Sequence, residues 1–177
     1  MKGLKINKRH LILSILGISL LIFPHIYGCK AEDHEKIHKS SITPFNELQF
    51  TKEGELTFFN KKNKQIITID IEITDTREEK RRGLMYRHDM AATEGMVFVN
   101  DMSQRHFFWM KNTYIPLDMI FVDEKMQIVK IEKNTVPLSE KFISVPKDAQ
   151  YTIEVNAGFC DRHSLKIGDS IQMVKIP

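Results

Sequence analysis

The residues best suited to ligand chemistry lie in one segment that is aromatic in its first half and polar in its second. In an extended chain, Phe107, Trp109 and Lys111 share one face of a strand. Both faces of this strand are largely apolar, which favours core packing of Phe107 and Trp109, with ligand contact as the alternative. Lys111 and Asn112 end the strand beside a turn. This turn can return Asp118 across from Lys111, so an ion pair between them is plausible.

Basic and amide side chains also occupy the ends of other predicted elements. Arg82 and Arg87 bracket the end of a short helix, and Asn156 ends a strand just before Ala157 and a glycine. Such groups suit an anionic or carbohydrate-like ligand, for which Trp109 offers a stacking surface. The structural alternative is that Arg82 pairs one helical turn back and Asn156 caps the following turn. The candidate ligand-binding residues are Arg82, Arg87, Trp109, Lys111, Asn112, Asp118 and Asn156.

The same region permits an enzymatic hypothesis. In it, Asp118 or Glu154 is the general base and Lys111 stabilises an oxyanion. Only the coexistence of carboxylates and cations near strand ends supports this hypothesis. A binding or accessory module is therefore favoured over an enzyme, and no catalytic residue is assigned.

Three further sequence patterns are of kinds that can bind a metal or supply a reactive thiol, but each lacks the structural context or the further ligands that such a site needs. Residues 34–38 match the zinc-protease pattern H-E-x-x-H, yet they lie in a polar segment rather than in a buried helix. Cys160 and His163 are three residues apart without a second pair of ligands. The methionines are irregularly spaced, which favours core packing over copper binding. The sequence predicts no metal site and no cofactor.

The N-terminal segment has the features of a bacterial lipoprotein leader. Basic residues from Lys2 to Arg9 precede an apolar stretch from Leu11 to Phe23, which suits a signal peptide and is too short to span a membrane. Cys29 follows a glycine, as in a lipobox, so lipidation at Cys29 is predicted; a plain secretory peptide and an uncleaved anchor are the alternatives. The predicted partner is the membrane. The predicted location is extracytoplasmic, facing the periplasm or at the outer membrane or cell surface.

The leader also accounts for the basic charge of the chain. The whole sequence has a formal net charge of +3, and residues 1–28 contribute four basic residues and no acidic ones, which leaves −1 for the rest. A nearly neutral body lacks the broad positive surface that non-specific nucleic-acid binding requires. Nucleic acid is therefore not an expected partner. Lipidation of Cys29 would also leave Cys160 without a disulfide partner.

The chain divides into the leader (residues 1–28), a lipidated cysteine with a polar tether (29–54) and one domain (55–177). Within the domain, isoleucines from Ile67 to Ile73 alternate with polar residues, which is typical of a half-buried strand. Thr76 and Glu79 match a capping box that begins a short helix, and a second short helix is expected at 158–165. The predicted fold is mainly β: a compact β-sandwich or partly closed barrel of about eight short strands with two short helices. The strands are expected at 56–60, 67–73, 96–100, 106–111, 117–122, 127–133, 151–156 and 170–176.

Four ordered segments of the domain resemble the domain-of-unknown-function 192 family (DUF192). They are TREEKRRGLMYR from Thr76, GMVFV from Gly95, FWMKNTYIPLDMIF from Phe108, and EVNAG from Glu154 followed by IGD from Ile167. The resemblance spans about Glu55 to Val174 and implies a small β-rich domain, often exported, with no established reaction or ligand. Cys160 and Ser164 depart from the family pattern, so a thiol mechanism cannot be a family property.

The combined pattern predicts a lipid-anchored extracytoplasmic protein. It would serve as a binding or accessory module of the cell envelope for a small anionic or carbohydrate-like ligand. One alternative is an enzyme with a site made of a lysine and a carboxylate. Another is a structural partner in an envelope complex, which would need an exposed apolar patch.

Overall fold

The computed structural model describes residues 49–101 and 106–177. The predicted leader, Cys29, the H-E-x-x-H segment and most of the tether lie outside the described residues. The described part contains nine strands and two short helices. None of its helices is long and apolar enough to cross a membrane.

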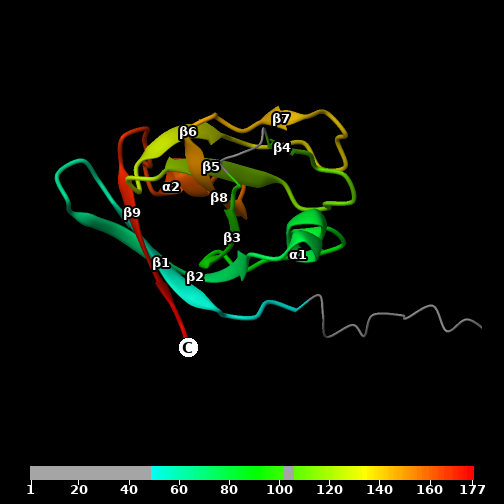
Figure 1. The fold of residues 1–177 in the computed structure, drawn as a ribbon, viewed down its shortest axis with the longest axis horizontal. Helices are drawn as coiled ribbons and strands as arrows, with labels where there is room; N and C mark the ends of the chain where they lie inside the picture. Colours follow the sequence, from blue (N-terminus) through cyan, green and yellow to red (C-terminus); the bar gives the residue numbers. More distant parts are fainter. Residues whose placement is uncertain (1–48, 102–105) are drawn as a thin grey trace, which may run out of the picture. The chain divides into compact units, whose positions relative to one another are not determined.

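Seven strands form the main sheet, which Figure 1 shows as a curled layer. Their order in the sheet is β6-β5-β8-β3-β2-β1-β9. Neighbouring strands are antiparallel except β2 and β3, which are parallel. The strands are β1 (Gly54–Phe59), β2 (Gln65–Thr74), β3 (Glu94–Val99), β5 (Leu117–Asp123), β6 (Ile128–Glu132), β8 (Ala149–Asn156) and β9 (Ser170–Lys175).

The two edges of the main sheet meet at one corner. The backbone N–H of Ile128 donates to the carbonyl oxygen of Asp169 at 2.8 Å, and the N–H of Ile171 donates to that of Met126 at 2.9 Å. A bridge between Gln127 and Ser170 lies between these bonds. The sheet is therefore curled into a partly closed barrel, and the predicted mainly-β class with two short helices is confirmed.

Apolar side chains cover both faces of the sheet. An inner core takes buried side chains from all seven strands and from the segment of α2 (Phe159–Arg162), which lies within the curl. An outer core on the opposite face contains three buried methionines, Met96, Met110 and Met119, together with Leu117 and Phe121. The methionines fill space between larger side chains, as their irregular spacing predicts. Strand β5 serves both cores, which explains why its sequence is almost continuously apolar.

Helix α1 (Arg77–Arg82) connects β2 to the segment before β3, and its capping box is confirmed. The N–H of Glu79 donates to the Thr76 hydroxyl at 3.3 Å, and the N–H of Thr76 donates to a Glu79 carboxylate oxygen at 3.0 Å. Hydrogen bonds to the Glu79 carboxylate from the backbone and side chain of Thr76 lower the pKa of Glu79, and the positive charge of Arg82 adds to the effect. The helix therefore begins at a fixed place and ends with basic residues in its last turn.

The segment predicted as a strand at 106–111 differs from expectation. Only β4 (Phe107–Phe108) forms, and it pairs with β7 (Ile143–Ser144) in a separate two-stranded sheet, the β4–β7 layer. Phe107 is 54% exposed and Trp109 is 38% exposed, so their predicted core position is wrong. The alternation itself is right: the partly buried Phe108 and the buried Met110 cover the outer core. The other face of this segment carries Phe107 and Trp109, whose rings pack against Phe142 at the surface. This surface contact accounts for the apolar residues on a face that is not part of the core.

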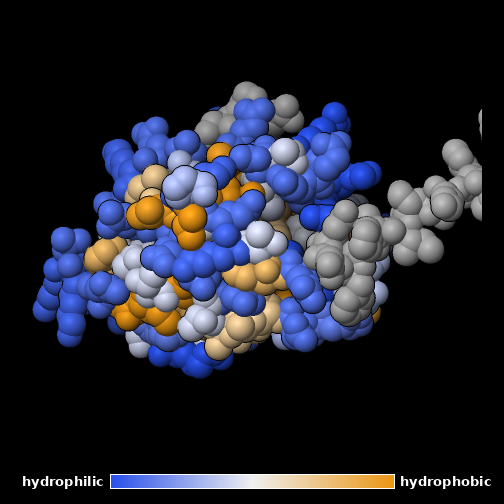
Figure 2. Space-filling view, turned by 90° about the horizontal axis from the view of Figure 1, so that it is seen from below, coloured by the Kyte–Doolittle hydropathy of each residue, from blue (hydrophilic) through white to orange (hydrophobic). Residues whose placement is uncertain are grey.

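Apolar residues also reach the surface elsewhere. On the face shown in Figure 2, they form small groups interspersed with hydrophilic residues rather than one broad area.

Candidate functional site

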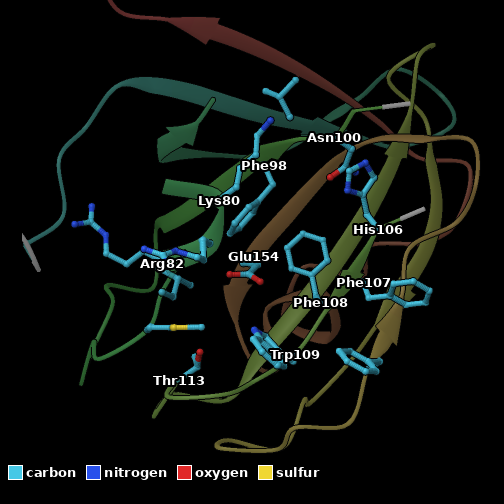
Figure 3. A pocket seen from close by; sticks show the side chains of 16 residues that line it. Lys80, Arg82, Phe98, Asn100, His106, Phe107, Phe108, Trp109, Thr113 and Glu154 are labelled. Atoms are coloured by element: carbon cyan, nitrogen blue, oxygen red, sulfur yellow. The ribbon is translucent and has the colours of Figure 1, made fainter. Parts of the chain in front are cut away.

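A cavity of about 370 Å³ lies where the end of α1, strand β3 and the β4–β7 layer approach one another. This volume is in the range of small-molecule sites. Figure 3 shows Glu154 near the middle of this cavity, with aromatic rings on one side and basic residues on another. We call it the Glu154 cavity; its main lining residues are Lys80, Arg82, Phe98, Phe108, Trp109 and Glu154.

Glu154 enters the cavity from strand β8, and its register explains its direction. It is aligned with Met96 on β3 and with Met119 on β5, both in the outer core, whereas its neighbours Ile153 and Val155 belong to the inner core. Because side chains alternate along a strand, Glu154 must point to the outer face. There the β4–β7 layer covers it, and the residue is only 4% exposed.

Burial changes the acid strength of this side chain. Removal of water from the carboxyl group raises the pKa of Glu154 from 4.5 to about 8. The carboxyl group has no hydrogen-bond or ion-pair partner among the described residues. At neutral pH it is therefore mostly protonated, and its O–H can donate a hydrogen bond to a molecule in the cavity.

Basic side chains from the last turn of α1 form the rim of the cavity. Lys80, Arg81 and Arg82 all line it. The helix can end this close to the cavity because Gly83 follows with φ +47°, and a Cβ there would lie 3.1 Å from the ring of Phe98. The absence of a side chain at Gly83 thus permits the close approach of basic rim and aromatic wall.

The aromatic wall has two parts. Phe98 and Phe108 meet edge to face with ring centroids 5.0 Å apart. Trp109 and Phe142 are nearly parallel, with centroids 6.0 Å apart. Faces of aromatic rings attract the C–H groups of a sugar or another ring, so the wall can hold a flat apolar surface. Together, a neutral acid, aromatic faces and cations suit a ring-containing molecule that carries negative charge.

A family model for DUF192, described as Uncharacterized ACR, matches residues 58–173, more than half of the chain. The chain belongs to the DUF192 family. A search of curated proteins found no significant match.

Two crystal structures resemble this DUF192 chain, each at 30% sequence identity. One, from Sinorhizobium meliloti 1021, is described as a "putative transcription regulator". It has a TM-score of 0.64, and the match covers 71% of this chain and 97% of that one. The other is a protein of unknown function from Novosphingobium aromaticivorans DSM 12444. Its TM-score is 0.62, and the match covers 67% of this chain and 83% of that one.

Four of the predicted site residues of the DUF192 domain lie together. Arg82 and Trp109 line the Glu154 cavity, and Lys111 and Asn112 join them around an adjoining cavity. The predicted ion pair between Lys111 and Asp118 does not form. Instead, Lys111 Nζ lies 3.4 Å from Glu140 Oε1 and 5.2 Å from the centre of the Trp109 ring.

Asp118 is unable to reach Lys111 because it points into the domain. It is fully buried, and its two carboxylate oxygens accept from the backbone N–H groups of Asn134 and Cys160, each at 2.9 Å. These bonds tie α2 and the segment after β6 to strand β5. Asp118 is thus held in structural hydrogen bonds, away from the Glu154 cavity.

Arg87 and Asn156 also hold other parts of the DUF192 domain. Arg87 is 7% exposed and forms an ion pair with Glu72 at 2.6 Å. The Asn156 amide donates to the carbonyl oxygens of Met90 and Ala91 at 2.7 and 3.1 Å, which fixes the loop before β3. The N-cap residue of α2 is Gly158, so Asn156 does not occupy the cap position that the structural alternative supposed. Neither Arg87 nor Asn156 lines the Glu154 cavity.

The thiol hypothesis loses its chemical basis. Cys160 is fully buried, and burial together with the neighbouring Asp118 raises the pKa of its thiol well above the usual range. A protonated thiol is a poor nucleophile. Among residues 49–101 and 106–177, no group of three metal-ligating side chains is gathered.

Sequence reasoning missed part of the Glu154 cavity. Lys80, Arg81 and Phe98 were not predicted, and Glu154 was considered only as a base. A signal existed in the run from Lys80 to Arg82, since three successive basic residues end the predicted helix, where the helix dipole favours cations. The burial of Glu154 had no such signal, because polar residues that alternate with apolar ones normally face solvent.

Proposed function

We propose that this chain is a lipid-anchored, extracytoplasmic protein whose DUF192 domain binds a small anionic or carbohydrate-like ligand in the Glu154 cavity. The observation that carries this proposal is a protonated carboxyl group inside an aromatic cavity with a basic rim. Each part offers a different interaction to the same molecule. A ligand with a ring, hydroxyl groups and a negative charge would use all of them.

Recognition would follow from the position of each group. The rings of Phe108 and Trp109 would cover the apolar face of the ligand ring. The Glu154 O–H would donate to a ligand hydroxyl or carboxylate, which would also give this buried polar group the partner it lacks. Lys80 and Arg82 would receive the negative charge at the rim through charge-assisted hydrogen bonds.

Binding is favoured over hydrolysis. Most glycoside hydrolases use two carboxylates that flank the scissile bond. Among the described residues lining the cavity, Glu154 is the only carboxylate. A single neutral acid can fix the orientation of a ligand, but it does not supply the second group of that mechanism.

The direct test is thermal unfolding of the full chain in the presence of single compounds. The compounds are glucuronate, galacturonate, N-acetylglucosamine, N-acetylmuramic acid, phosphate and acetate. A ligand present at 100 times its Kd should add about 2.7 kcal/mol to stability. We expect stabilisation by the acidic sugars and a weaker effect for N-acetylglucosamine.

Two variants of the cavity and one control variant show whether the stabilisation depends on the cavity. Glu154→Gln keeps the size and a donor but removes the titration, and Arg82→Ala removes a rim cation. As the control, Lys125→Ala removes an exposed cation that does not line the cavity. Stabilisation should fall for Arg82→Ala and persist for Lys125→Ala. Absence of stabilisation by every compound would reject the binding proposal.

The anchor is tested separately, because it depends on Cys29 alone. Lipid attachment and cleavage of a lipoprotein leader both require that thiol. We expect Cys29→Ser to be released from the membrane fraction or to keep its leader. A Cys29→Ser chain that stays in the membrane fraction at its mature size would reject the lipid anchor and leave the ligand proposal standing.

A further inference from the structure

A second cavity of about 640 Å³ adjoins the Glu154 cavity. Four residues line both: Arg81, Arg82, Met85 and Trp109. The second cavity extends from these shared residues to Tyr86, Lys111 and Asn112, and we call it the Lys111 compartment. The exposed indole of Trp109 therefore stands between two spaces rather than at the end of one.

The walls of the Lys111 compartment are held in place by unusual backbone geometry. Tyr86 and Asn112 have φ values of +66° and +57°, in the left-handed region that bulky residues rarely adopt. The N–H of Tyr86 donates to the Asn112 carbonyl oxygen at 2.7 Å, and the Asn112 amide donates to the Tyr86 hydroxyl at 2.8 Å. These two bonds keep the 47% exposed Tyr86 ring beside the compartment.

Each of the two cavities is lined by both aromatic rings and basic side chains. Phe108 and Lys80 line the Glu154 cavity, and Tyr86 and Lys111 line the Lys111 compartment. Glu78 and Glu79 also line the Lys111 compartment, but Glu79 is engaged by the capping box. Counting Glu154 as neutral, the basic side chains that line the two cavities outnumber the charged carboxylates that line them, and Lys111 also forms an exposed ion pair with Glu140 outside the lining. A ligand whose rings and negative charges repeat would match this arrangement.

We infer that the ligand is an acidic oligosaccharide of at least two sugar units, which lies across Trp109 with one unit in the Glu154 cavity and the next in the Lys111 compartment. This inference rests on the proposed function and names its ligand class. The indole of Trp109 contacts both units, and Lys111 receives the charge of the second. A monosaccharide fills only one of the two spaces.

Calorimetric titration of the full chain with galacturonate and digalacturonate tests this inference. The disaccharide should bind about tenfold more tightly than the monosaccharide, the gain expected from one further charge-assisted contact. N,N′-diacetylchitobiose, which has two rings and no charge, should bind more weakly than digalacturonate. Equal affinities for galacturonate and digalacturonate would overturn the inference.

A pair of variants locates the gain. Lys111→Met keeps an unbranched apolar side chain against Trp109 but removes the charge, so the advantage of the disaccharide should disappear. Lys125→Met, at an exposed position away from both cavities, should keep it. If Lys111→Met retains the tenfold advantage, the second unit does not use the Lys111 compartment and the inference fails.

The outcomes separate this inference from the proposed function. If galacturonate binds, Arg82→Ala weakens it, and the disaccharide gains nothing, the Glu154 cavity binds ligand but the oligosaccharide inference is wrong. If phosphate or acetate binds and no sugar does, the inference is again wrong. If none of the compounds binds, both fail.

Discussion

Two buried glutamates in one cross-strand row have different surroundings. Glu72 on β2 and Glu154 on β8 are both aligned with Met96 on the strand between them. Glu72 meets the guanidinium of Arg87 at 2.6 Å, whereas Glu154 faces a cavity without a charged partner among the described residues. The two glutamates lie on the same face of the sheet, but Glu72 is held in a buried ion pair, whereas Glu154 has a buried carboxyl group without a charged partner among the described residues. An unused buried group is the better indicator of a ligand site.

The largest effect should come from removal of the partner of Glu72. Arg87→Ala leaves a buried carboxylate without its cation, which typically costs about 3 to 5 kcal/mol. Urea unfolding of the full chain measures this loss. The double variant Glu72→Gln with Arg87→Met, which removes both charges, should lose less. A loss of unfolding free energy below about 1 kcal/mol for Arg87→Ala would show that the ion pair between Glu72 and Arg87 does not stabilise the fold as proposed.

Glu154 should make stability depend on pH. The folded protein keeps a proton up to about pH 8, whereas the unfolded chain releases it near the ordinary value of 4.5. Between these values a rise in pH therefore favours unfolding, by up to about 1.4 kcal/mol per pH unit. The stabilisation from this group is complete below about pH 4.5 and is lost by about pH 8.

The variant Glu154→Gln isolates this contribution. It has no proton to lose, so its unfolding free energy should fall less steeply than that of the wild type between pH 5 and 8. Urea titrations at several pH values give both curves. Parallel curves would mean that Glu154 ionises normally. Ligand affinity should also weaken above pH 8, because an ionised Glu154 repels an anion.

The smallest effect on stability should come from Trp109. Trp109→Ala removes a partly exposed side chain, so we expect a loss of about 1 kcal/mol or less, together with loss of ligand binding. Met110→Ala, at the next position, empties part of the outer core and should cost about 2 to 5 kcal/mol. Thermal unfolding compares the two variants. A larger loss of stability for Trp109→Ala than for Met110→Ala would show that the Trp109 side chain is packed in the core.

Local patterns predicted the fold well where one face of a strand or one helix end decided the structure. The alternating isoleucines of β2 and the capping box at Thr76 depend on neighbours in the sequence. The strand and the capping box are confirmed, but Glu72, on the face of β2 predicted to be polar, is buried. The β4–β7 layer was missed because it depends on a contact between residues 107–108 and 143–144. A strand of two residues is too short to show the alternation of apolar and polar residues from which a strand is predicted.

The candidate site was predicted in part for the same reason. Arg82, Trp109, Lys111 and Asn112 lie at element ends, where the sequence marks polar groups, and the structure gathers them. Asp118 and Asn156 also lie in or at the end of strands, but their partners come from segments 16 to 66 residues away. Glu154 became a site residue only because a distant layer covers its face of the sheet. Coverage by distant segments is not encoded in a local pattern.

The pairing of the first and last strands has a consequence for the time at which this domain folds. Strand β9 pairs with β1, and its first residues also close the corner with the segment before β6. Contacts between residues so far apart in sequence form slowly. They are also impossible until β9 has been synthesised. A chain with the proposed export leader would therefore stay incompletely folded during synthesis, in the state that passage across a membrane requires, and would complete its barrel only after its C-terminal strand arrives.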